Sequence, residues 1–316
     1  MNDQKNKSSR RFLWTAIRIA GTCLALGITL WLLPRHEVLA TMRSVPLTVW
    51  LFTFCVFLAG NVVAAAKWWL LTSRSEDVPF RIALKAHFAG QMANVFLPGA
   101  VGGDVVRVGM VFKQSQSKPR IAVGSAVDRI LDSLGLLLLS CVGGLFALGG
   151  KLDNTLLQVG AIGLLAVVSI PVFLFVLGKF EHIGIVAKVR AAILEFRQEP
   201  LKLVLCLALS MSVQATFIGL NITLARSSGI HIPVAAWFFA WPLSKLIAVL
   251  PISLGGLGVR EASLAALLTR FGAPAARTVA VGLVWQTILM ASATVGAIVL
   301  LVSTRSKLSP AGDLPR

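Results

Sequence analysis

Long apolar segments alternate with short polar ones along this chain. A helix needs about 20 apolar residues to cross a bilayer. Six segments reach that length: 12–33, 46–71, 121–148, 155–177, 201–224 and 275–302. Helices satisfy their own backbone hydrogen bonds in lipid. The pattern therefore predicts an all-α polytopic membrane protein with six full spans.

Two further apolar stretches are shorter, and each ends in a break rich in proline and glycine. Residues 80–97 lead into LPGAVGGDVVR (97–107), and residues 233–250 lead into LPISLGGLGVR (250–260). Both breaks read LPxxxGGxxxR, with every matched residue offset by 153 positions. Proline stops a helix and glycine permits unusual backbone conformations. We expect two broken or re-entrant helical hairpins, which make eight spans if each broken pair is counted as a crossing.

The segments around the two breaks follow the same order, which predicts an internal duplication. A single membrane domain, 12–302, would contain a leading helix, repeat 1 (46–148), a linking helix (155–177) and repeat 2 (201–302). Segment 201–224 lies three spans after 46–71, so the repeats would be antiparallel and their hairpins would enter from opposite sides. Inverted repeats with broken helices recur in alternating-access transporters.

Charge sets the expected orientation. The chain is 56% hydrophobic and 14% charged, with a net charge of +17, whereas soluble proteins carry about 25% charged residues. With cytoplasmic tails at 1–11 and 303–316, the cytoplasmic segments hold nineteen of the 30 Lys and Arg, and the opposite side holds eight. This bias follows the positive-inside rule and favours an anionic lipid surface as partner. We expect a multipass protein of the cytoplasmic (inner) membrane, and no nucleic-acid partner.

Other residue types point away from cofactor chemistry. The four cysteines lie far apart in apolar runs and the four histidines are scattered, so neither a disulfide framework nor a metal site is predicted. No Walker motif is present, and we expect no cofactor. Four tryptophans are expected in interfacial belts, namely Trp68, Trp69, Trp237 and Trp241.

Each break carries groups that suit an anion. Asp104 is a candidate N-cap for the helix that continues through Arg107, and Gly258 precedes Arg260 and Glu261 in the second copy. Free N–H groups at a helix N-terminus and an arginine one turn later favour phosphate. In the alternative interpretation, glycine and proline merely turn a hairpin and each arginine pairs with a nearby carboxylate, Asp104 or Glu261.

A third cluster lies early in the predicted span 121–148. Asp128 and Asp132 share a helix face, and Arg129 is spaced to pair with Asp132. Ionisable residues in spanning helices are costly and often functional, but a structural ion pair at the interface explains them equally well.

Uncharged polar residues and one lysine accompany the breaks. Gln91 and Asn94 precede the first break and Lys245 precedes the second. They would line a cavity or form hydrogen bonds between helices. Gln214 and Asn221 share one helix face and are expected to serve such packing.

The motifs NVFLPGAVGGDVVR, AVDRILD and LPISLGGLGVREASL together resemble the flippase-like family typified by the transmembrane part of lysylphosphatidylglycerol synthases. The resemblance covers residues 12–302. It implies a multipass inner-membrane protein that moves lipids, with these substrate-binding residues: Asn94, Pro98, Gly102, Gly103, Asp104, Arg107, Asp128, Arg129, Asp132, Pro251, Ser253, Gly255, Gly256, Gly258, Arg260 and Glu261.

The expected function is therefore that of a lipid flippase. It would move an anionic or isoprenoid-linked headgroup through a cavity between inverted repeats, with Arg107 and Arg260 on the phosphate. Because the chain ends at Arg316, soon after the last span, we expect no aminoacyl-transferase domain and no enzyme activity. Two alternatives stay open: a membrane-embedded lipid-modifying transferase that uses the acidic residues, and an accessory subunit that joins lipid-synthesis enzymes.

Overall fold

The computed structural model describes residues 33–73, 78–96, 102–112, 117–149, 193–248 and 257–305, with isolated positions between them, and these ranges are helical without any strand. Four long helices are apolar enough to cross a membrane: α3 (Leu47–Thr72), α6 (Lys118–Ala147), α9 (Pro200–Ser227) and α12 (Ala275–Arg305). They confirm four predicted spans. The spans expected at 12–33 and 155–177 fall outside the described residues, apart from isolated positions.

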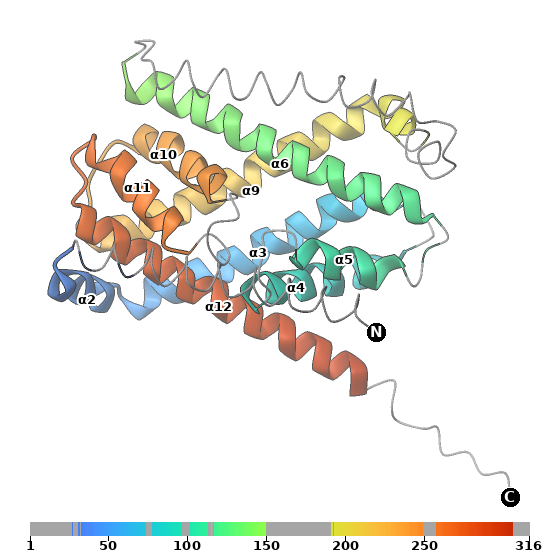
Figure 1. The fold of residues 1–316 in the computed structure, drawn as a ribbon, viewed down its shortest axis with the longest axis horizontal. Helices are drawn as coiled ribbons and strands as arrows, with labels where there is room; N and C mark the ends of the chain where they lie inside the picture. Colours follow the sequence, from blue (N-terminus) through green and yellow to red (C-terminus); the bar gives the residue numbers. More distant parts are fainter. Residues whose placement is uncertain are drawn as a thin grey trace, which may run out of the picture.

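Four shorter helices form the two predicted hairpins. The first consists of α4 (Phe80–Phe96) and α5 (Gly102–Phe112), and the second of α10 (Val234–Ile247) and α11 (Val259–Thr269). Figure 1 shows α4 and α5 toward one end of the molecule and α10 and α11 toward the opposite end. Five predicted site residues in the breaks lie outside the described residues: Pro98, Pro251, Ser253, Gly255 and Gly256.

The start of α5 differs in detail from the expectation, and the start of α11 agrees with it. α5 already begins at Gly102, so Asp104 lies in its first turn and is not the N-cap. α11 begins after Gly258, whose φ of 83° is a conformation that glycine adopts most easily. The carboxylate of Glu261 accepts a hydrogen bond from the Gly258 N–H at 2.8 Å and satisfies this helix end.

One short helix was not anticipated. α2 (Arg35–Ser44) occupies a stretch that the hydrophobic pattern assigned to a connection. Its Val38 packs against Ala276 and Ala280 of α12, so packing against α12 stabilises a helix that its own sequence does not predict.

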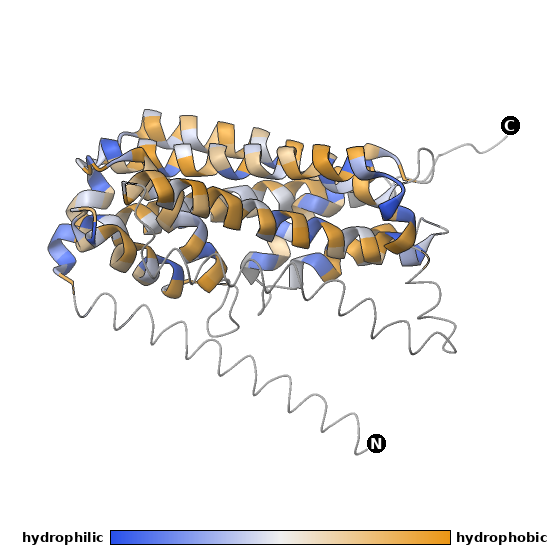
Figure 2. Ribbon diagram, turned by 90° about the horizontal axis from the view of Figure 1, so that it is seen from above, coloured by the Kyte–Doolittle hydropathy of each residue, from blue (hydrophilic) through white to orange (hydrophobic). Residues whose placement is uncertain are grey.

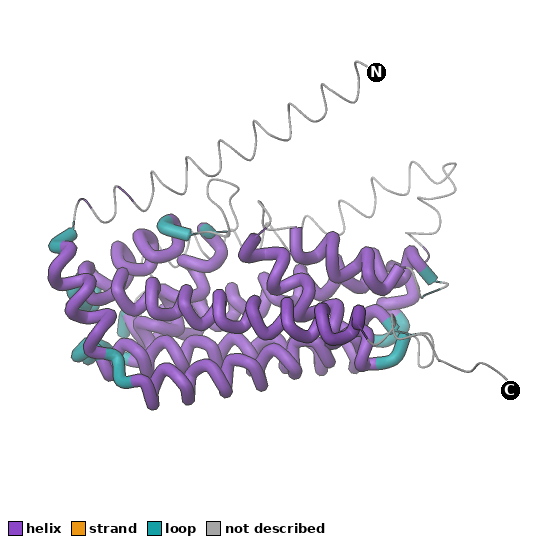
Figure 3. Tube along the Cα trace, turned by 90° about the horizontal axis from the view of Figure 1, so that it is seen from below, coloured by secondary structure: helices purple, strands orange, loops and turns teal. Residues whose placement is uncertain are grey.

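The long helices lie lengthwise in the molecule, and most of their residues are hydrophobic (Figure 2). Viewed from below, the described loops are short, and most of them lie toward the two ends (Figure 3). α3 packs on α9, where the Phe57 and Phe217 rings lie 4.8 Å apart. Trp68, Trp237 and Trp241 are buried among the helices, so the interfacial position expected for them is wrong; large rings fill the interior here.

Each hairpin packs against the last long helix of the other half. α10 lies on α6, and α4 lies on α12. A Cβ added to Gly143 of α6 would come within 2.6 Å of the Phe239 backbone nitrogen, and one on Gly296 of α12 within 2.5 Å of the Phe88 carbonyl oxygen. These glycines are 153 positions apart, the same offset that relates the two breaks.

Candidate functional site

Lys67 lies at the centre of a group of charged residues between α3, α5 and α6. It is the one charged residue of α3, and it is 2% exposed. Its Nζ is 3.0 Å from Asp128 Oδ1 and also forms an ion pair with Asp132 Oδ1. The two aspartates share a face of α6, as predicted, and that face meets α3. A lysine buried this deeply is stabilised by such counter-charges.

Arg107 joins this group from α5. Its Nη2 lies 3.1 Å from Asp128 Oδ2 and 3.2 Å from Asp104 Oδ1, and its guanidinium stacks 4.5 Å from the centre of the Trp68 ring. The side chain is 7% exposed. Arg107 therefore pairs with carboxylates, as the alternative interpretation of the sequence proposed.

Arg129 completes the group, but with a different partner from the one predicted. Its Nε lies 2.6 Å from Asp104 Oδ2, so the expected pair with Asp132 is wrong. Asp132 faces α3 and binds Lys67, whereas Arg129 leaves α6 on the side of α5. Opposite charges alternate through what we call the charge chain: Arg129, Asp104, Arg107, Asp128, Lys67 and Asp132.

Small residues allow α5 to approach α4 closely enough to build this site. A Cβ on Gly103 would lie 2.3 Å from the Gly90 carbonyl oxygen, so only glycine fits. The Gly103 N–H donates a hydrogen bond to Asn94 Oδ1 at 2.9 Å. Gly103 and Asn94 of the first signature therefore hold the hairpin together and place Arg107 beside α6.

Gln91 lies in a neighbouring network of hydrogen bonds between helices. Its Oε1 accepts a hydrogen bond from Ser292 of α12 at 3.0 Å, and its Nε2 donates to Asn61 of α3. His87 contacts Asn61 Oδ1 at 3.4 Å. These contacts correspond to the helix–helix hydrogen bonding that we considered for Gln91.

The second hairpin carries a smaller set of charges. Arg260 Nε donates to Glu261 Oε1 at 3.1 Å, and its Nη2 donates to Gln286 Oε1 of α12 at 3.3 Å. Glu261 is fully buried, and its side chain occupies the space in which Gly282 would carry a Cβ. Arg260 thus contacts the long helix after its hairpin, as Arg107 contacts α6.

Lys245 of α10 has a different environment. Its Nζ donates a hydrogen bond to Gln214 Oε1 of α9 at 2.9 Å and lies 5.1 Å from the centre of the Trp241 ring. The side chain is half-buried, and it has no carboxylate partner within ion-pair distance in the described part of the chain. Gln214 therefore forms the kind of hydrogen bond between helices that was predicted for it, and its partner is the Lys245 ammonium group.

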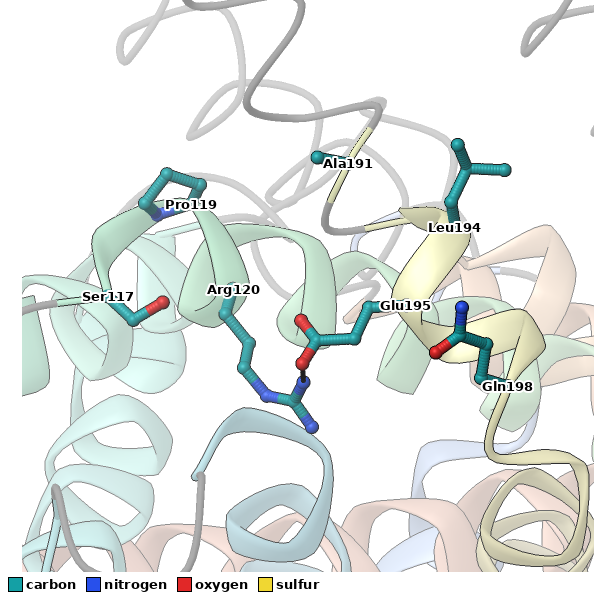
Figure 4. Close-up of a pocket in the computed structure, with 7 residues that line it drawn as sticks. All are labelled: Ser117, Pro119, Arg120, Ala191, Leu194, Glu195 and Gln198. Atoms are coloured by element: carbon teal, nitrogen blue, oxygen red, sulfur yellow. Dashed lines mark ion pairs between the residues drawn. The ribbon is translucent and has the colours of Figure 1, made fainter.

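A pocket of about 560 Å³ lies apart from these charges, beside the starts of α6 and α9 (Figure 4). Arg120 Nη1 is 2.6 Å from Glu195 Oε1, and its Nη2 is 3.4 Å from Glu199 Oε2. Burial alone would raise the pKa of Glu199, but Lys202 and Arg120 outweigh burial and lower it. Arg120 is the one cation among the described residues that line this pocket, and it is paired with carboxylates.

The sequence did not identify Lys67, Ser210 or Gln286 as site residues. Ser210 Oγ donates to Asp132, and Gln286 accepts from Arg260. A single lysine in a 26-residue apolar helix was a signal for Lys67, whereas serine and glutamine in apolar helices are too common to mark a site. Within the described ranges, no three His, Cys, Asp or Glu side chains are grouped to hold a metal ion.

Comparison with known protein families shows which family the chain matches. The model described as the lysylphosphatidylglycerol synthase TM region matches residues 16–297. A search of curated proteins finds no match.

Proposed function

Because the chain belongs to the family of lysylphosphatidylglycerol synthase transmembrane regions, we propose that this multipass membrane protein is a lipid translocase. It moves an anionic or isoprenoid-linked lipid headgroup across the cytoplasmic membrane. The family supports a role connected with membrane lipids, and the arguments for translocation come from the helices themselves.

The charge chain is the observation that carries the proposal. Lys67 and Asp128 lie in helices long and apolar enough to span a membrane, and both are almost fully buried. Ionisable residues inside such helices are expensive and typically mark a pathway for a substrate or ion. A polar interior would let a headgroup cross while its acyl chains stay in lipid.

The arrangement of the helices supports alternating access. The order α3, α4, α5, α6 recurs as α9, α10, α11, α12, and the two hairpins lie toward opposite ends (Figure 1). We interpret the halves as inverted repeats, in which each hairpin would control access from one side. The excess of lysine and arginine on one side would place that side and both tails in the cytoplasm.

Arg107 and Arg260 are the proposed phosphate contacts of the two sides. Each arginine contacts a carboxylate, Asp104 for Arg107 and Glu261 for Arg260. A lipid phosphate would compete for the same guanidinium groups, which bind phosphate with two parallel hydrogen bonds. Exchange between an internal carboxylate and the headgroup would keep each arginine neutralised throughout a transport cycle.

The same pairing supports translocation over a lipid-modifying reaction. Glu261 binds Arg260 and the Gly258 N–H, and the three aspartates of the charge chain each contact a cation. A general base needs a carboxylate free to accept a proton from the substrate. The acidic residues here are occupied as counter-ions.

Transport by purified protein tests this proposal. Proteoliposomes with a fluorescent phosphatidylglycerol report translocation through the loss of dithionite-accessible fluorescence. We expect Arg107→Ala and Arg260→Ala each to lower the rate roughly tenfold, since a charged hydrogen bond contributes on the order of 1.5–3 kcal/mol.

Arg226→Ala is the matched control, because Arg226 lies exposed in the last turn of α9. It should transport at the wild-type rate. Unchanged rates in both the Arg107 and the Arg260 variants, at equal protein level, would remove the role assigned to these arginines. Wild-type transport without any other protein would argue against a purely accessory subunit.

A further inference from the structure

Asp132 differs from the other carboxylates of the charge chain and the second hairpin in how its two oxygens are used. Lys67 and Ser210 both bind its Oδ1, and no hydrogen bond or ion pair from the described part of the chain reaches its Oδ2. The other three use both oxygens in contacts with cations or with a backbone N–H: Asp104, Asp128 and Glu261. One oxygen of Asp132 is therefore available to a proton.

Asp132 is also the most open carboxylate of the charge chain. Its side chain is 29% exposed, against 19% for Asp104 and 4% for Asp128. It lies near the middle of α6, and transporters built from inverted repeats bind their substrates and coupling ions near the middle of the membrane. Asp132 thus combines a free oxygen with a position from which a proton can be exchanged.

Two lysines, one from each half, act on Asp132. Lys67 of α3 pairs with it, and Lys245 of α10 acts on it electrostatically. The same face of α9 contacts both lysines, because Ser210 binds the Lys67–Asp132 pair and Gln214, one turn later, accepts the hydrogen bond from Lys245. Asp132 therefore lies where the two halves meet, in a place that also attracts anions.

We propose that Asp132 binds a proton when an anionic headgroup enters this cluster, so that each lipid crosses the membrane together with one proton. This inference rests on the proposed translocase function and adds an energy source to it. Hydronium on one side of the membrane gives its proton to Asp132 Oδ2, where an O–H bond forms, and the proton returns to water on the other side.

The physical reason is competition between like charges. Pairing with Lys67 makes Asp132 a counter-ion. A lipid phosphate that approaches the same lysine brings a second anion into a poorly solvated place, where two negative groups disfavour each other and a carboxylate is neutralised by a proton. Protonation of Asp132 removes the conflict, and Asp128 still contacts Lys67.

The coupling has a direction, because linkage between two ligands is reciprocal. The anion favours the proton, and the proton favours the anion, so the lipid is loaded on the more acidic side and released on the more alkaline side. Besides the charge chain and Lys245, His87 of α4 acts on Asp132. Histidine commonly changes charge near neutral pH, so the pH dependence has to be assigned by substitution of Asp132.

Transport under a pH gradient tests the coupling in the full-length protein. Proteoliposomes with fluorescent phosphatidylglycerol receive a gradient at zero membrane potential, and the gradient is collapsed before dithionite is added. For a gradient of about one pH unit, we expect the labelled lipid to accumulate up to roughly tenfold on the alkaline side, the ratio that one proton per lipid allows. Protein-free liposomes under the same gradient give the background.

Asp132→Asn is the decisive variant. Its amide resembles the protonated carboxyl group and leaves Lys67 in contact with Asp128, so we expect a folded protein that distributes the label evenly. Asp132→Glu keeps a carboxylate that can bind a proton and should keep the accumulation. Glu37→Gln is the matched control, because Glu37 of α2 pairs with Arg277 outside the charge chain; it should accumulate label like wild type.

Lipid binding in detergent gives a second measurement that does not depend on transport. We expect the affinity for phosphatidylglycerol to fall as the pH rises in wild type and to stay nearly constant in Asp132→Asn. The phosphodiester lacks the second ionisation of a phosphomonoester, so the pH dependence reports the protein. Ser210→Ala removes a hydroxyl that stabilises the ionised carboxylate, and the fall should then occur at a higher pH.

The outcomes separate this inference from the function on which it rests. Transport by wild type with an even distribution of label would leave the translocase intact and overturn the coupling. A wild-type pH response in folded Asp132→Asn would assign the proton to another residue. If that variant does not fold, an unshifted pH dependence in Ser210→Ala overturns the assignment. If wild type does not transport, the translocase function fails, and the pH dependence of binding alone decides whether Asp132 is a proton site.

Discussion

At the scale of single residues, the interior depends on how Lys67 is neutralised. One amine contacts two aspartates, and one of these, Asp128, also binds Arg107. A buried charge pair adds little net stability when it is complete, because desolvation offsets the attraction, but removal of one partner leaves an uncompensated charge. The charge chain should therefore be sensitive to single substitutions.

Lys67→Met tests this sensitivity. The substitution keeps an unbranched side chain only one atom shorter and leaves Asp132 without its cation, so we expect a loss of stability of roughly 3–5 kcal/mol. A thermal melt in detergent, followed by size-exclusion chromatography, measures it. Lys85→Met should melt close to wild type.

A double variant separates charge from packing. Lys67→Met with Asp132→Asn removes the uncompensated carboxylate and should recover part of the lost stability. If the double variant melts no higher than Lys67→Met alone, the loss comes from the shape of the side chain and not from its charge.

The sequence alone could not identify the partners of these residues, and the reason is physical. Spacing along α6 correctly placed Asp128 and Asp132 on one face, since that depends only on the helical period. Which residue meets that face depends on how α3 packs, and Lys67 is 61 positions from Asp128 along the chain. The same limit explains the wrong partner predicted for Arg129.

At the scale of the elements, glycines set the distance between helices of different halves. Gly143 receives the backbone of α10, and Gly296 receives that of α4. Small residues are the usual means by which membrane helices approach closely, because packing replaces the hydrophobic effect there. These two contacts join each hairpin to the other half.

Gly143→Ala and Gly296→Ala should each separate the helices that meet at the glycine. The new methyl group would overlap with backbone atoms, which cannot rotate away, so we expect a cost of roughly 1–3 kcal/mol. Melting temperature in detergent is the measurement. Gly219→Ala in α9 has open space around it and should match or slightly exceed wild type; equal melting of all three would refute the close contacts.

The long spans and the two hairpins were predictable from the sequence, whereas the short helix α2 was not. The four described spans begin and end within a few residues of the apolar segments, because lipid demands a continuous apolar helix. The hairpins followed from proline and glycine in the breaks. α2 was missed because its stability comes from α12 and not from a periodic pattern of its own.

At the scale of the whole molecule, the two ends should lie on opposite sides of the membrane. Lys118 begins α6 after the first hairpin, and Arg270 follows α11 at the end of the second, and both are exposed. In a cysteine-free background, we expect an impermeant maleimide to label Arg270→Cys in intact cells. Lys118→Cys should react only after lysis. Labelling of both from the same side would contradict the inverted arrangement.

The contacts at Gly143 and Gly296 also bear on biogenesis. α6 leaves the ribosome long before α10 is made, so the surface around Gly143 faces lipid or the insertion machinery until the second half arrives. Each half is completed only by a hairpin from the other. We therefore expect assembly in the membrane to be completed late, when the two halves dock.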